Sequence, residues 1–334
     1  GFPVVKSFKA EPEILDILKE KANSGLDVRV LYDDMGSFAM LPSNYPKLLG
    51  KYGIKCMQFN KLSPFAGIIM NNRDHRKMMI IDGHTAFSGG INISDEYINI
   101  NSKLGVWKDN GIRIKGEAVW NFTVMFLEMW NSFKKEDNDY NKYKYNFTEK
   151  YKENGFVVPY GESPLDDVIT GEDIYLNIIN QAKKYVYIYT PYLIIDTDMI
   201  NSLILAARRG VDVRIVVPGI PDKKIVYDLT SSYFYTLIKG GVKIYTYTNG
   251  FVHSKVFLSD DEIATVGTIN LDYRSLYLHF ECGIYMKDTN VIKDIKKDFE
   301  DSFKESHKVD EKEAKNGLFK GLWQAILRLF APMM

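Results

Sequence analysis

Two segments of the chain carry the same reactive side chains at the same spacing. Each contains His-x-Lys, then an Asp 7 positions and an Asn 17 positions after the His. Side chains two residues apart in a strand share one face, so each imidazole and its ammonium should point the same way. A glycine-containing turn, Gly89-Gly90 or Gly267-Thr268, leads to each Asn. The two sets are His75, Lys77, Asp82 and Asn92, and His253, Lys255, Asp260 and Asn270.

Such a set suits chemistry at a phosphodiester. One imidazole can attack phosphorus and form a phosphohistidine, while the other protonates the departing alcohol and later deprotonates the incoming one. The lysines supply positive charge to the phosphate oxygens, and the amides of Asn92 and Asn270 are neutral donors, with Thr268 assisting. This scheme requires no metal or cofactor.

Each residue type also has a structural interpretation. A lone His is usually structural, but the identical surroundings of His75 and His253 favour catalysis. An unpaired ammonium between apolar neighbours is costly, and a bound phosphate would offset that cost for Lys77 and Lys255. Asn92 and Asn270 could cap turns, although their shared offset favours phosphate contact. We expect Asp82 and Asp260, at the far end of each motif, to be structural turn residues.

The repeat extends beyond the motifs and predicts the elements that position them. Residues 17–34 align with 204–219 as helix, glycine cap and buried strand, and residues 52–59 align with 240–247 as a strand. The segment WKDNGIRI aligns with HFECGIYM, which pairs Asp109 with Glu281 as the carboxylates that orient the imidazoles. We expect His279, two positions earlier, to face away from the site.

The second repeat has a helix near 172–184 and a strand at 185–190 that the first repeat lacks. The chain also starts at Gly1, so we expect the first repeat to be truncated at its N-terminus. The polar segment 134–160 suits a surface connection. The predicted organisation is a first unit at 1–133, this connection, a second unit at 161–306 and a tail at 307–334.

The motifs HRKMMIID…SGGIN and HSKVFLSD…VGTIN resemble those of the phospholipase D superfamily, whose members build one active site from two such motifs. The segments NNRDHRKMMIIDGHTAFSGGINISDEY, GTINLDYRSLYLHFECG and LWQAILRLFAPMM resemble bacterial cardiolipin synthases, from about Ile14 onward. The resemblance implies an α/β fold with two repeated α/β/α units, central mixed sheets, pseudo-twofold symmetry and one shared active site. It also assigns His75 as nucleophile, His253 as general acid and base, and Glu281 as an imidazole support.

The same resemblance implies the reaction and the location. We expect phosphatidyl transfer between two phosphatidylglycerol molecules, giving cardiolipin and glycerol, in an enzyme of the bacterial cell membrane. Its catalytic region would face the cytoplasm, after N-terminal membrane-spanning helices that this sequence does not include. A phospholipase D hydrolase or a phosphatidylserine synthase would use the same residues, and an inactive lipid-binding module is a further alternative. Arg274, in an N-x-D-x-R-S stretch, and Arg73 are candidates for second-shell or headgroup contacts.

Composition narrows these classes. The 334 residues are 46% hydrophobic, which is enough for two ordinary cores. Lys plus Arg and Asp plus Glu both number 43, so the formal net charge is zero and no global field attracts nucleic acid. The two cysteines, Cys56 and Cys282, form no metal or disulfide pattern. No apolar run is long enough to span a bilayer.

The C-terminal segment 318–330 is apolar except for Gly321 and a stripe of Lys320, Gln324 and Arg328, which recur every 4 positions. Such a helix packs into a groove of the body or lies in the membrane interface. We favour the interface, because a lipid substrate requires an apolar approach surface. The segment SPFAGIIM, 63–70, is an apolar lip or a buried strand. The membrane-facing candidates on the helix are Phe319, Leu322, Trp323, Ile326 and Phe330.

Overall fold

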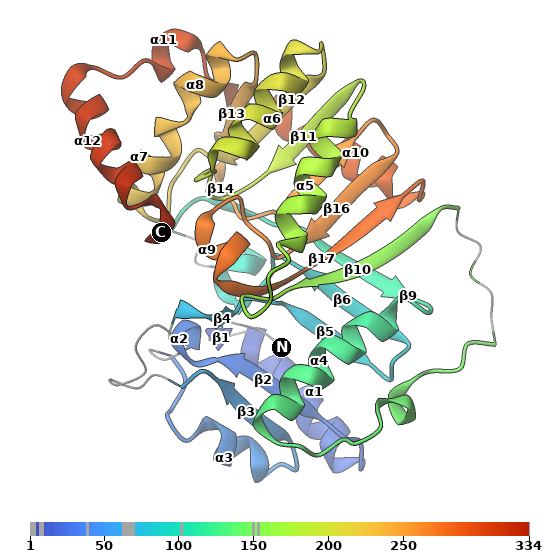
Figure 1. Ribbon diagram of the computed structural model, residues 1–334. Coiled ribbons are helices and arrows are strands. Elements are labelled where there is room, and N and C mark those ends of the chain that lie inside the picture. Colours follow the sequence, from blue (N-terminus) through green and yellow to red (C-terminus); the bar gives the residue numbers. More distant parts are fainter. Residues whose placement is uncertain are drawn as a thin grey trace.

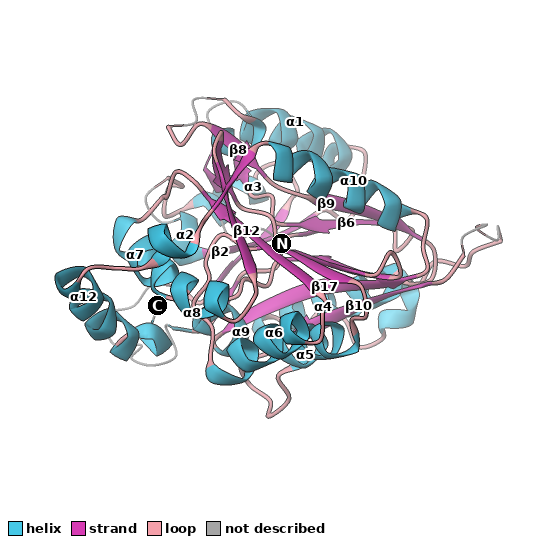
Figure 2. Cartoon of the chain, turned by 90° about the horizontal axis from the view of Figure 1, so that it is seen from above, coloured by secondary structure: helices cyan, strands magenta, loops and turns pink. Residues whose placement is uncertain are grey.

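The computed structural model describes residues 5–6, 10–37, 40–61, 71–100, 103–148, 151 and 154–333. Its two α/β halves lie one above the other in Figure 1, with the first half below. Seen from above, strands form the middle layer, with α1 (Ala10–Asn23) and α10 (Val291–Lys304) on one side (Figure 2). On the other side lie α4 (Val119–Phe133), α5 (Thr170–Gln181) and α6 (Thr197–Arg208). The predicted layered α/β architecture is confirmed.

The second half is built on one mixed sheet. Its central strand β11 reads Tyr-Val-Tyr-Ile-Tyr and is buried throughout, as expected for a strand with neighbours on both edges. The helix α6 begins after Asp196, whose carboxylate accepts from the backbone N–H of Met199 at 2.8 Å. The strand order is β10 (Phe156–Glu162), β17 (His279–Lys287), β16 (Ile263–Gly267), β15 (Val256–Ser259), β11 (Tyr185–Tyr189), β12 (Asp212–Pro218), β13 (Lys243–Tyr247) and β18 (Ser306–Lys308).

The strands of the first half follow the same order, except that none is described at the position of β11. In the second half, β11 joins β12 to β15. Among the described residues, no strand joins the corresponding β2 and β5. The strands of this half form a parallel pair, β2 (Arg29–Asp33) with β3 (Lys55–Phe59), and an antiparallel sheet of β5 (Met78–Ile81), β6 (Thr85–Gly89) and β9 (Gly111–Lys115).

The two halves share a core, and short strands of one half pair with strands of the other. Met78 and Phe122 of the first half pack in one cluster with Leu258 and Ile284 of the second. The strand β4 (Arg73–Asp74) pairs with β17, and β8 (Val106–Lys108) pairs with β14 (Gly250–Val252). Each of these two short pairings therefore joins one half to the other.

Several short elements complete the chain. The connection expected at 134–160 ends earlier, because residues from Phe156 onward form β10 on the edge of the second sheet. The remaining elements are β1 (Val5–Lys6), α2 (Asp34–Ser37), α3 (Tyr45–Gly50), β7 (Ile93–Ser94), η2 (Asp95–Ile98), η3 (Tyr140–Tyr143), α7 (Lys224–Ser232), α8 (Phe234–Lys239), α9 (Tyr273–Tyr277), α11 (Glu311–Ala314), α12 (Leu318–Leu329) and η4 (Ala331–Met333).

Candidate active site

His75 directly follows β4, the strand of the first half that pairs with β17 of the second. The backbone N–H of His75 donates to the carbonyl of Phe280 at 2.8 Å. The next residue on β17, Glu281, is fully buried and places a carboxylate oxygen 2.8 Å from Nδ1 of His75. A buried carboxylate on Nδ1 fixes the ring orientation and leaves Nε2 for substrate. The second half thus orients the imidazole of the first.

His253 has the reciprocal arrangement. It follows β14, and its backbone N–H donates to the carbonyl of Lys108 at 2.7 Å, at the end of β8. The adjacent Asp109 places a carboxylate oxygen 2.8 Å from Nδ1 of His253. Among the described residues, Nε2 of neither imidazole has a hydrogen-bond partner. The alignment of Asp109 with Glu281 identified both carboxylates, but their exchange between halves was not predicted.

The carboxylate of Glu281 is held by two hydroxyls, those of Thr268 and Ser275, which both donate to it. The Thr268 hydroxyl is also 3.1 Å from the carbonyl of Cys282. We expected Thr268 to assist the phosphate directly. In the structure its hydroxyl donates to Glu281 instead. The sequence did not point to Ser275 of α9, which also donates to Glu281.

The first half has glycine at the position equivalent to Thr268. A Cβ built on Gly90 would lie 2.1 Å from Oδ1 of Asp109, so the carboxylate occupies the space of the missing side chain. The backbone N–H of Asn110 donates to the same oxygen at 2.8 Å. The carboxylate of the shorter Asp109 therefore packs directly against Gly90, whereas the carboxylate of the longer Glu281 accepts a hydrogen bond from Thr268.

Both motif lysines are buried beside the imidazoles. Nζ of Lys77 donates to the carbonyl of His75 at 2.6 Å, and Nζ of Lys255 lies 2.8 Å from Nδ1 of His253. Lys77 is 1% exposed and Lys255 is 2% exposed. Burial lowers the pKa of Lys77 to about 8 and that of Lys255 to about 7. Two desolvated ammonium groups in one site favour an anionic ligand.

The imidazoles share this electrostatic environment. Burial, and then the charges of Lys77, Lys255 and His253, hold the pKa of His75 well below its usual value. Burial and Lys255 lower the pKa of His253 to about 4, despite the opposing charge of Asp109. Both shifts favour the neutral form of the imidazoles. The charges of Lys255 and His253 both lower the pKa of His75, so the two motifs lie close enough to influence each other.

The two asparagines lie buried after their glycine-containing turns. Nδ2 of Asn92 donates to the hydroxyl of Tyr97 at 2.7 Å, and the backbone N–H of Asn270 donates to Ser275 at 2.8 Å. The side-chain Oδ1 atoms of both asparagines are buried without a partner in the described part of the chain. Their contact with phosphate stays a prediction.

The two motif aspartates behave differently. Both have the left-handed turn conformation, with φ of 54° at Asp82 and 57° at Asp260. The carboxylate of Asp260 accepts from the backbone N–H groups of Lys183, Lys184 and Tyr185 at 2.7, 2.8 and 2.9 Å. These residues lead into β11, the strand without a described counterpart in the first half. Asp260 is therefore structural, and Asp82 is an exposed turn residue.

His279 does not face away from the site. Its ring centroid lies 5.7 Å from that of His75, and its Nδ1 is 3.9 Å from the carboxylate of Glu281. Our expectation failed because Glu281 and His279 are two residues apart on β17 and share one face. The ligand atoms of His75, His279 and Glu281 lie within 4.8 Å of one another, close enough to hold a metal ion.

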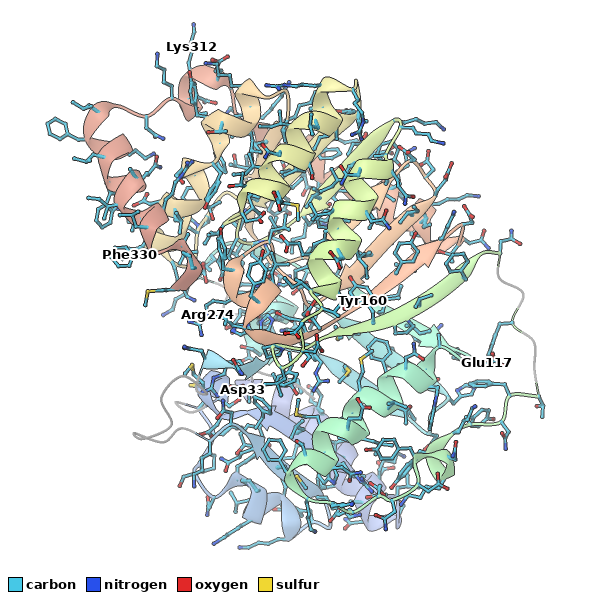
Figure 3. All side chains as sticks on the ribbon, in the orientation of Figure 1. Asp33, Glu117, Tyr160, Arg274, Lys312 and Phe330 are labelled. Atoms are coloured by element: carbon cyan, nitrogen blue, oxygen red, sulfur yellow. The ribbon has the colours of Figure 1, made fainter. Side chains whose placement is uncertain are left out.

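The two arginine candidates have different surroundings. Nε of Arg274 approaches Nε2 of His279 at 3.5 Å. Arg274 therefore lies near His75 and Glu281, at the junction of the two halves (Figure 3). Arg73 is 5% exposed, and one of its nitrogens donates to the carbonyl of Asn60 at 2.9 Å. Its Nη1 also lies 3.4 Å from the carboxylate of Asp33. Within the described part of the chain its Nε and Nη2 have no hydrogen-bond partner, so Arg73 stays a candidate for headgroup contact.

Three aromatic rings surround His253, and sequence reasoning missed them. Their centroids lie 5.2 Å (Tyr97), 5.5 Å (Trp107) and 6.0 Å (Phe251) from the imidazole centroid. The His253 side chain is 9% exposed, against 21% for His75. The rings account for this difference, because they exclude water from one imidazole and not from the other.

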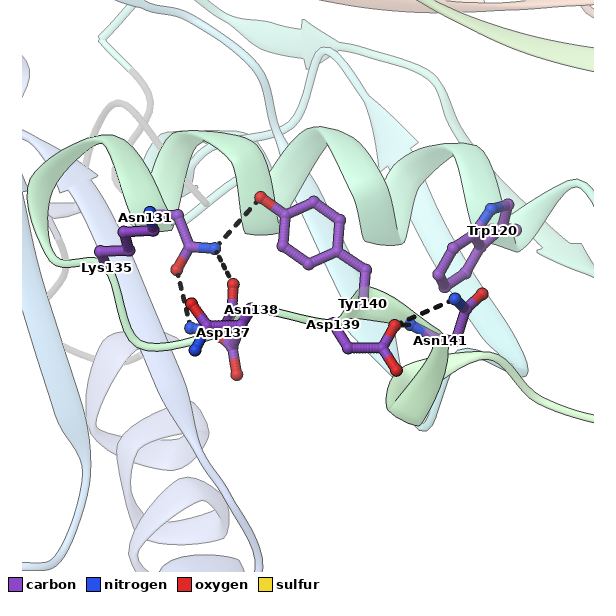
Figure 4. A pocket seen from close by; sticks show the side chains of 8 residues that line it. All are labelled: Trp120, Asn131, Lys135, Asp137, Asn138, Asp139, Tyr140 and Asn141. Carbon is purple, nitrogen blue, oxygen red and sulfur yellow. Dashed lines mark hydrogen bonds between the residues drawn. The ribbon is translucent and has the colours of Figure 1, made fainter.

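Other surface features lie apart from these residues. A hollow of about 550 Å³ runs along α4, and its polar groups bond to one another (Figure 4). Trp120 lines this hollow, whereas Trp130 is buried in the core. The lip expected at 63–70 lies outside the described residues. The membrane-facing candidates of the tail are exposed on α12.

The duplicated fold, with two His-x-Lys motifs meeting at one site, defines a member of the phospholipase D superfamily. A sequence model described as "Cardiolipin synthase, PLD-like domain" matches residues 4–130 and 175–303. The chain belongs to this family. The matched ranges correspond to the two halves of the fold.

Curated relatives agree with this assignment. The chain is 41% identical over 293 residues to cardiolipin synthase 1 of Staphylococcus aureus, covering 85% of this chain and 57% of the relative. It is 36% identical over 335 residues to cardiolipin synthase 2 of Staphylococcus epidermidis, covering 99% and 68%. An uncharacterized protein of Streptococcus mutans is 52% identical over 287 residues, covering 85% and 61%. The chain thus spans about three-fifths of the length of several of these relatives.

A solved structure supports the fold. Phosphatidylserine synthase of Haemophilus influenzae aligns with a TM-score of 0.71 and 17% identity, covering 99% of this chain and 87% of that one. At this identity the likeness concerns the fold alone. Within the described residues, no helix has the length and apolar character needed to cross a membrane.

Proposed function

We propose that the chain is the catalytic part of a cardiolipin synthase, which transfers a phosphatidyl group from one phosphatidylglycerol to another. The observation that carries this proposal is the reciprocal pair of imidazoles, each held by a carboxylate of the opposite half and accompanied by a buried lysine. The names of the curated relatives support the choice of lipid.

In the first step, Nε2 of His75 attacks phosphorus. The P–N bond forms, the bond from phosphorus to the glycerol oxygen breaks, and Nε2 of His253 protonates that oxygen. Lys77 and Lys255 stabilise the charge on the phosphoryl oxygens. The greater exposure of His75 supports its assignment as nucleophile, because its ring is the more accessible to substrate.

In the second step, a hydroxyl of another phosphatidylglycerol attacks the phosphohistidine. His253, now neutral, takes the proton of this hydroxyl, and the P–N bond breaks to give cardiolipin and regenerate both imidazoles. For the first step His253 must be protonated. A bound phosphodiester anion raises the low pKa of His253, because an adjacent negative charge favours the imidazolium.

Product analysis tests this function. Vesicles with phosphatidylglycerol as the sole phospholipid should yield cardiolipin and glycerol in equal amounts, measured by mass spectrometry. Phosphatidic acid as the main product would identify a hydrolase, and phosphatidylserine formed in the presence of serine would identify the other transferase. Lipid binding without turnover by a preparation of the full-length protein would identify a binding module. Activity should persist after exhaustive chelation.

Variants of the two histidines test the division of roles. His75→Asn should abolish a phosphoenzyme trapped with radiolabelled phosphatidylglycerol. His253→Asn should still form it from a substrate whose leaving group needs no proton, such as a phosphatidyl nitrophenol. Phosphoenzyme formation by His75→Asn would contradict the assigned roles.

A further inference from the structure

The helix α12 contacts the body through the polar side chains of Gln324 and Arg328 and through one apolar residue, Leu327, which is 4% exposed and joins the core. Nε2 of Gln324 donates to the carbonyl of Asp228 at 3.0 Å and to the hydroxyl of Ser231 at 3.1 Å, both on α7. Nε of Arg328 donates to Ser232 at 3.0 Å. Gln324 is only 4% exposed, although it is one of few polar residues of the helix. This is the reverse of an ordinary surface helix, which buries its apolar side.

The apolar side of α12 consequently faces outward. Leu318 is 86% exposed, Phe319 is 90%, Leu322 is 62% and Leu329 is 78%. Figure 3 shows Phe330 beyond the end of this helix, on its outer side. Trp323, Ile326 and Met333 are also exposed. The alternative in which the helix packs its apolar side into a groove is therefore not what the structure shows. A contiguous apolar surface of this kind indicates a binding partner.

The charges of this segment indicate the chemistry of the partner. Between residues 316 and 333 the only ionisable side chains are Lys320 and Arg328, both cationic. An exposed apolar helix with basic residues and a tryptophan is typical of binding to an anionic lipid interface. A second copy of the chain fits less well, because a twofold contact on this surface would bring like charges together without an acid.

The tail is linked by packing contacts to residues that support His75. The turn η4, which follows α12, packs against α9. That short helix carries Arg274 and Ser275, and Ser275 donates to the carboxylate of Glu281. The helix α7, which holds α12, begins at Lys224, two residues after Asp222. The carboxylate of Asp222 accepts from the Tyr192 hydroxyl at 2.7 Å.

We propose that the outer faces of α12 and η4 form a docking surface for an anionic phospholipid bilayer, which holds the active site beside its lipid substrate. The helix lies flat in the interface, with Phe319, Leu322 and Leu329 among the acyl chains. The choice of a phospholipid surface rests on the proposed function, but the binding can be measured without catalysis.

Vesicle sedimentation tests the surface. Leu322→Glu should lower the partition coefficient on vesicles of phosphatidylglycerol and phosphatidylcholine by about tenfold or more, because an anion replaces a leucine that would lie among the acyl chains. The matched control is Leu205→Glu, which alters a leucine that is 52% exposed on α6. This control should bind as the parent chain does. Equal binding by Leu322→Glu and the parent, or equal losses in both variants, would overturn the proposal.

Fluorescence identifies the contacting face. A brominated phosphatidylglycerol should quench Trp323, and Trp323→Phe should remove this quenching while retaining most of the vesicle binding. Unquenched Trp323 in vesicle-bound protein would overturn the proposal. Light scattering after size exclusion tests the alternative partner, and a dimer that Leu322→Glu dissociates would assign the surface to a second copy instead.

Catalysis is measured separately. His75→Asn should bind vesicles normally while losing turnover, and Leu322→Glu should retain turnover of phosphatidylglycerol dispersed in detergent. Failure of the proposed reaction would therefore leave the docking result intact. Loss of turnover by Leu322→Glu in detergent would show that the substitution acts on the active site rather than on docking.

Discussion

Each imidazole depends on a carboxylate that is remote in the sequence. His75 and Glu281 are 206 residues apart, and Asp109 and His253 are 144 apart. Their local supports differ, since hydroxyls of Thr268 and Ser275 hold Glu281, while Asp109 lies over Gly90. The two imidazole–carboxylate pairs therefore contain the same chemical groups, but different neighbouring residues hold their carboxylates in place.

Glu281→Gln should lower turnover by about 10²–10⁴-fold, because the neutral amide no longer fixes the tautomer of His75 or stabilises its charged form. The control is Glu172→Gln, another buried acid of the second half, which accepts from Tyr277 at 2.9 Å and should leave turnover unchanged. Steady-state rates and melting temperatures of both variants provide the comparison. A structural role alone would lower the melting temperature without shifting the pH profile of turnover, and that result would contradict the positioning role.

The buried lysines predict a pH-dependent stability. Their pKa values fall from 10.5 to about 8 and about 7 on folding, so between pH 7 and 9 the unfolded chain binds more protons than the folded one. The free energy of unfolding of the empty protein should therefore rise with pH in this window. Thermal melts from pH 7 to 9 measure the slope. The double variant Lys77→Met, Lys255→Met should reduce it, and an unchanged slope would assign it to other groups.

At the scale of elements, turns and short strands place the reactive groups. The pairings of β4 with β17 and of β8 with β14 span only two and three residues, yet each sets one imidazole beside its carboxylate. The carboxylate of Asp260 fixes the entry to β11, the central strand of the second sheet. Asp82 has the same position in its motif, but no strand equivalent to β11 is described beside it.

This difference gives a matched pair of substitutions. Asp260→Asn should lower the free energy of unfolding by about 1–3 kcal/mol. The three backbone N–H groups donate to both carboxylate oxygens, and the NH₂ group that replaces one oxygen in asparagine cannot accept a hydrogen bond. Asp82→Asn should change it by less than about 0.5 kcal/mol, since asparagine tolerates the same turn conformation. Urea unfolding measures both. Similar losses in the two variants would show that the motif aspartates have equal structural roles.

Much of this organisation could be predicted from the repeat. The equal offsets of His, Lys and Asn predicted the candidate set, and alignment of the halves pointed to Asp109 and Glu281, which the structure places beside the imidazoles. The exchange of strands could not be predicted, because pairings of two or three residues leave no periodic pattern. Ser275, Tyr97 and Phe251 were missed for a related reason, since each reaches the site only through the tertiary fold.

The tail shows another limit of sequence patterns. A polar stripe with a period of four residues indicates a helix with two unlike faces, but it does not say which face meets the body. In α12 the decisive contacts are those of Gln324 and Arg328 with α7, about 100 residues earlier in the chain. Similarly, the strand β10 lies within a segment whose composition favoured a surface connection.

At the scale of the whole molecule, the halves form one structural unit. They share the core that contains Met78 and Leu258, and the exchanged strands join them at the site. The connection between them contributes comparatively little to this contact. The continuity of the chain at Tyr151, which is exposed, should therefore be dispensable once the protein has folded.

A specific protease site inserted at Tyr151 tests this expectation. After cleavage the two fragments should elute together on size exclusion and retain the turnover of the uncut protein, because the shared core remains. They should separate only in denaturant. Fragments that separate in native buffer, or that lose turnover while still associated, would contradict the expectation.

The exchange of carboxylates also bears on ancestry. A chain with a single copy of the repeat would have an imidazole without its acid, because the acid of each pair comes from the other copy. Two such chains facing each other would supply both pairs at once. The two halves are therefore arranged as a pair of self-associating chains would be, and their fusion lets each copy differ in how it holds its acid.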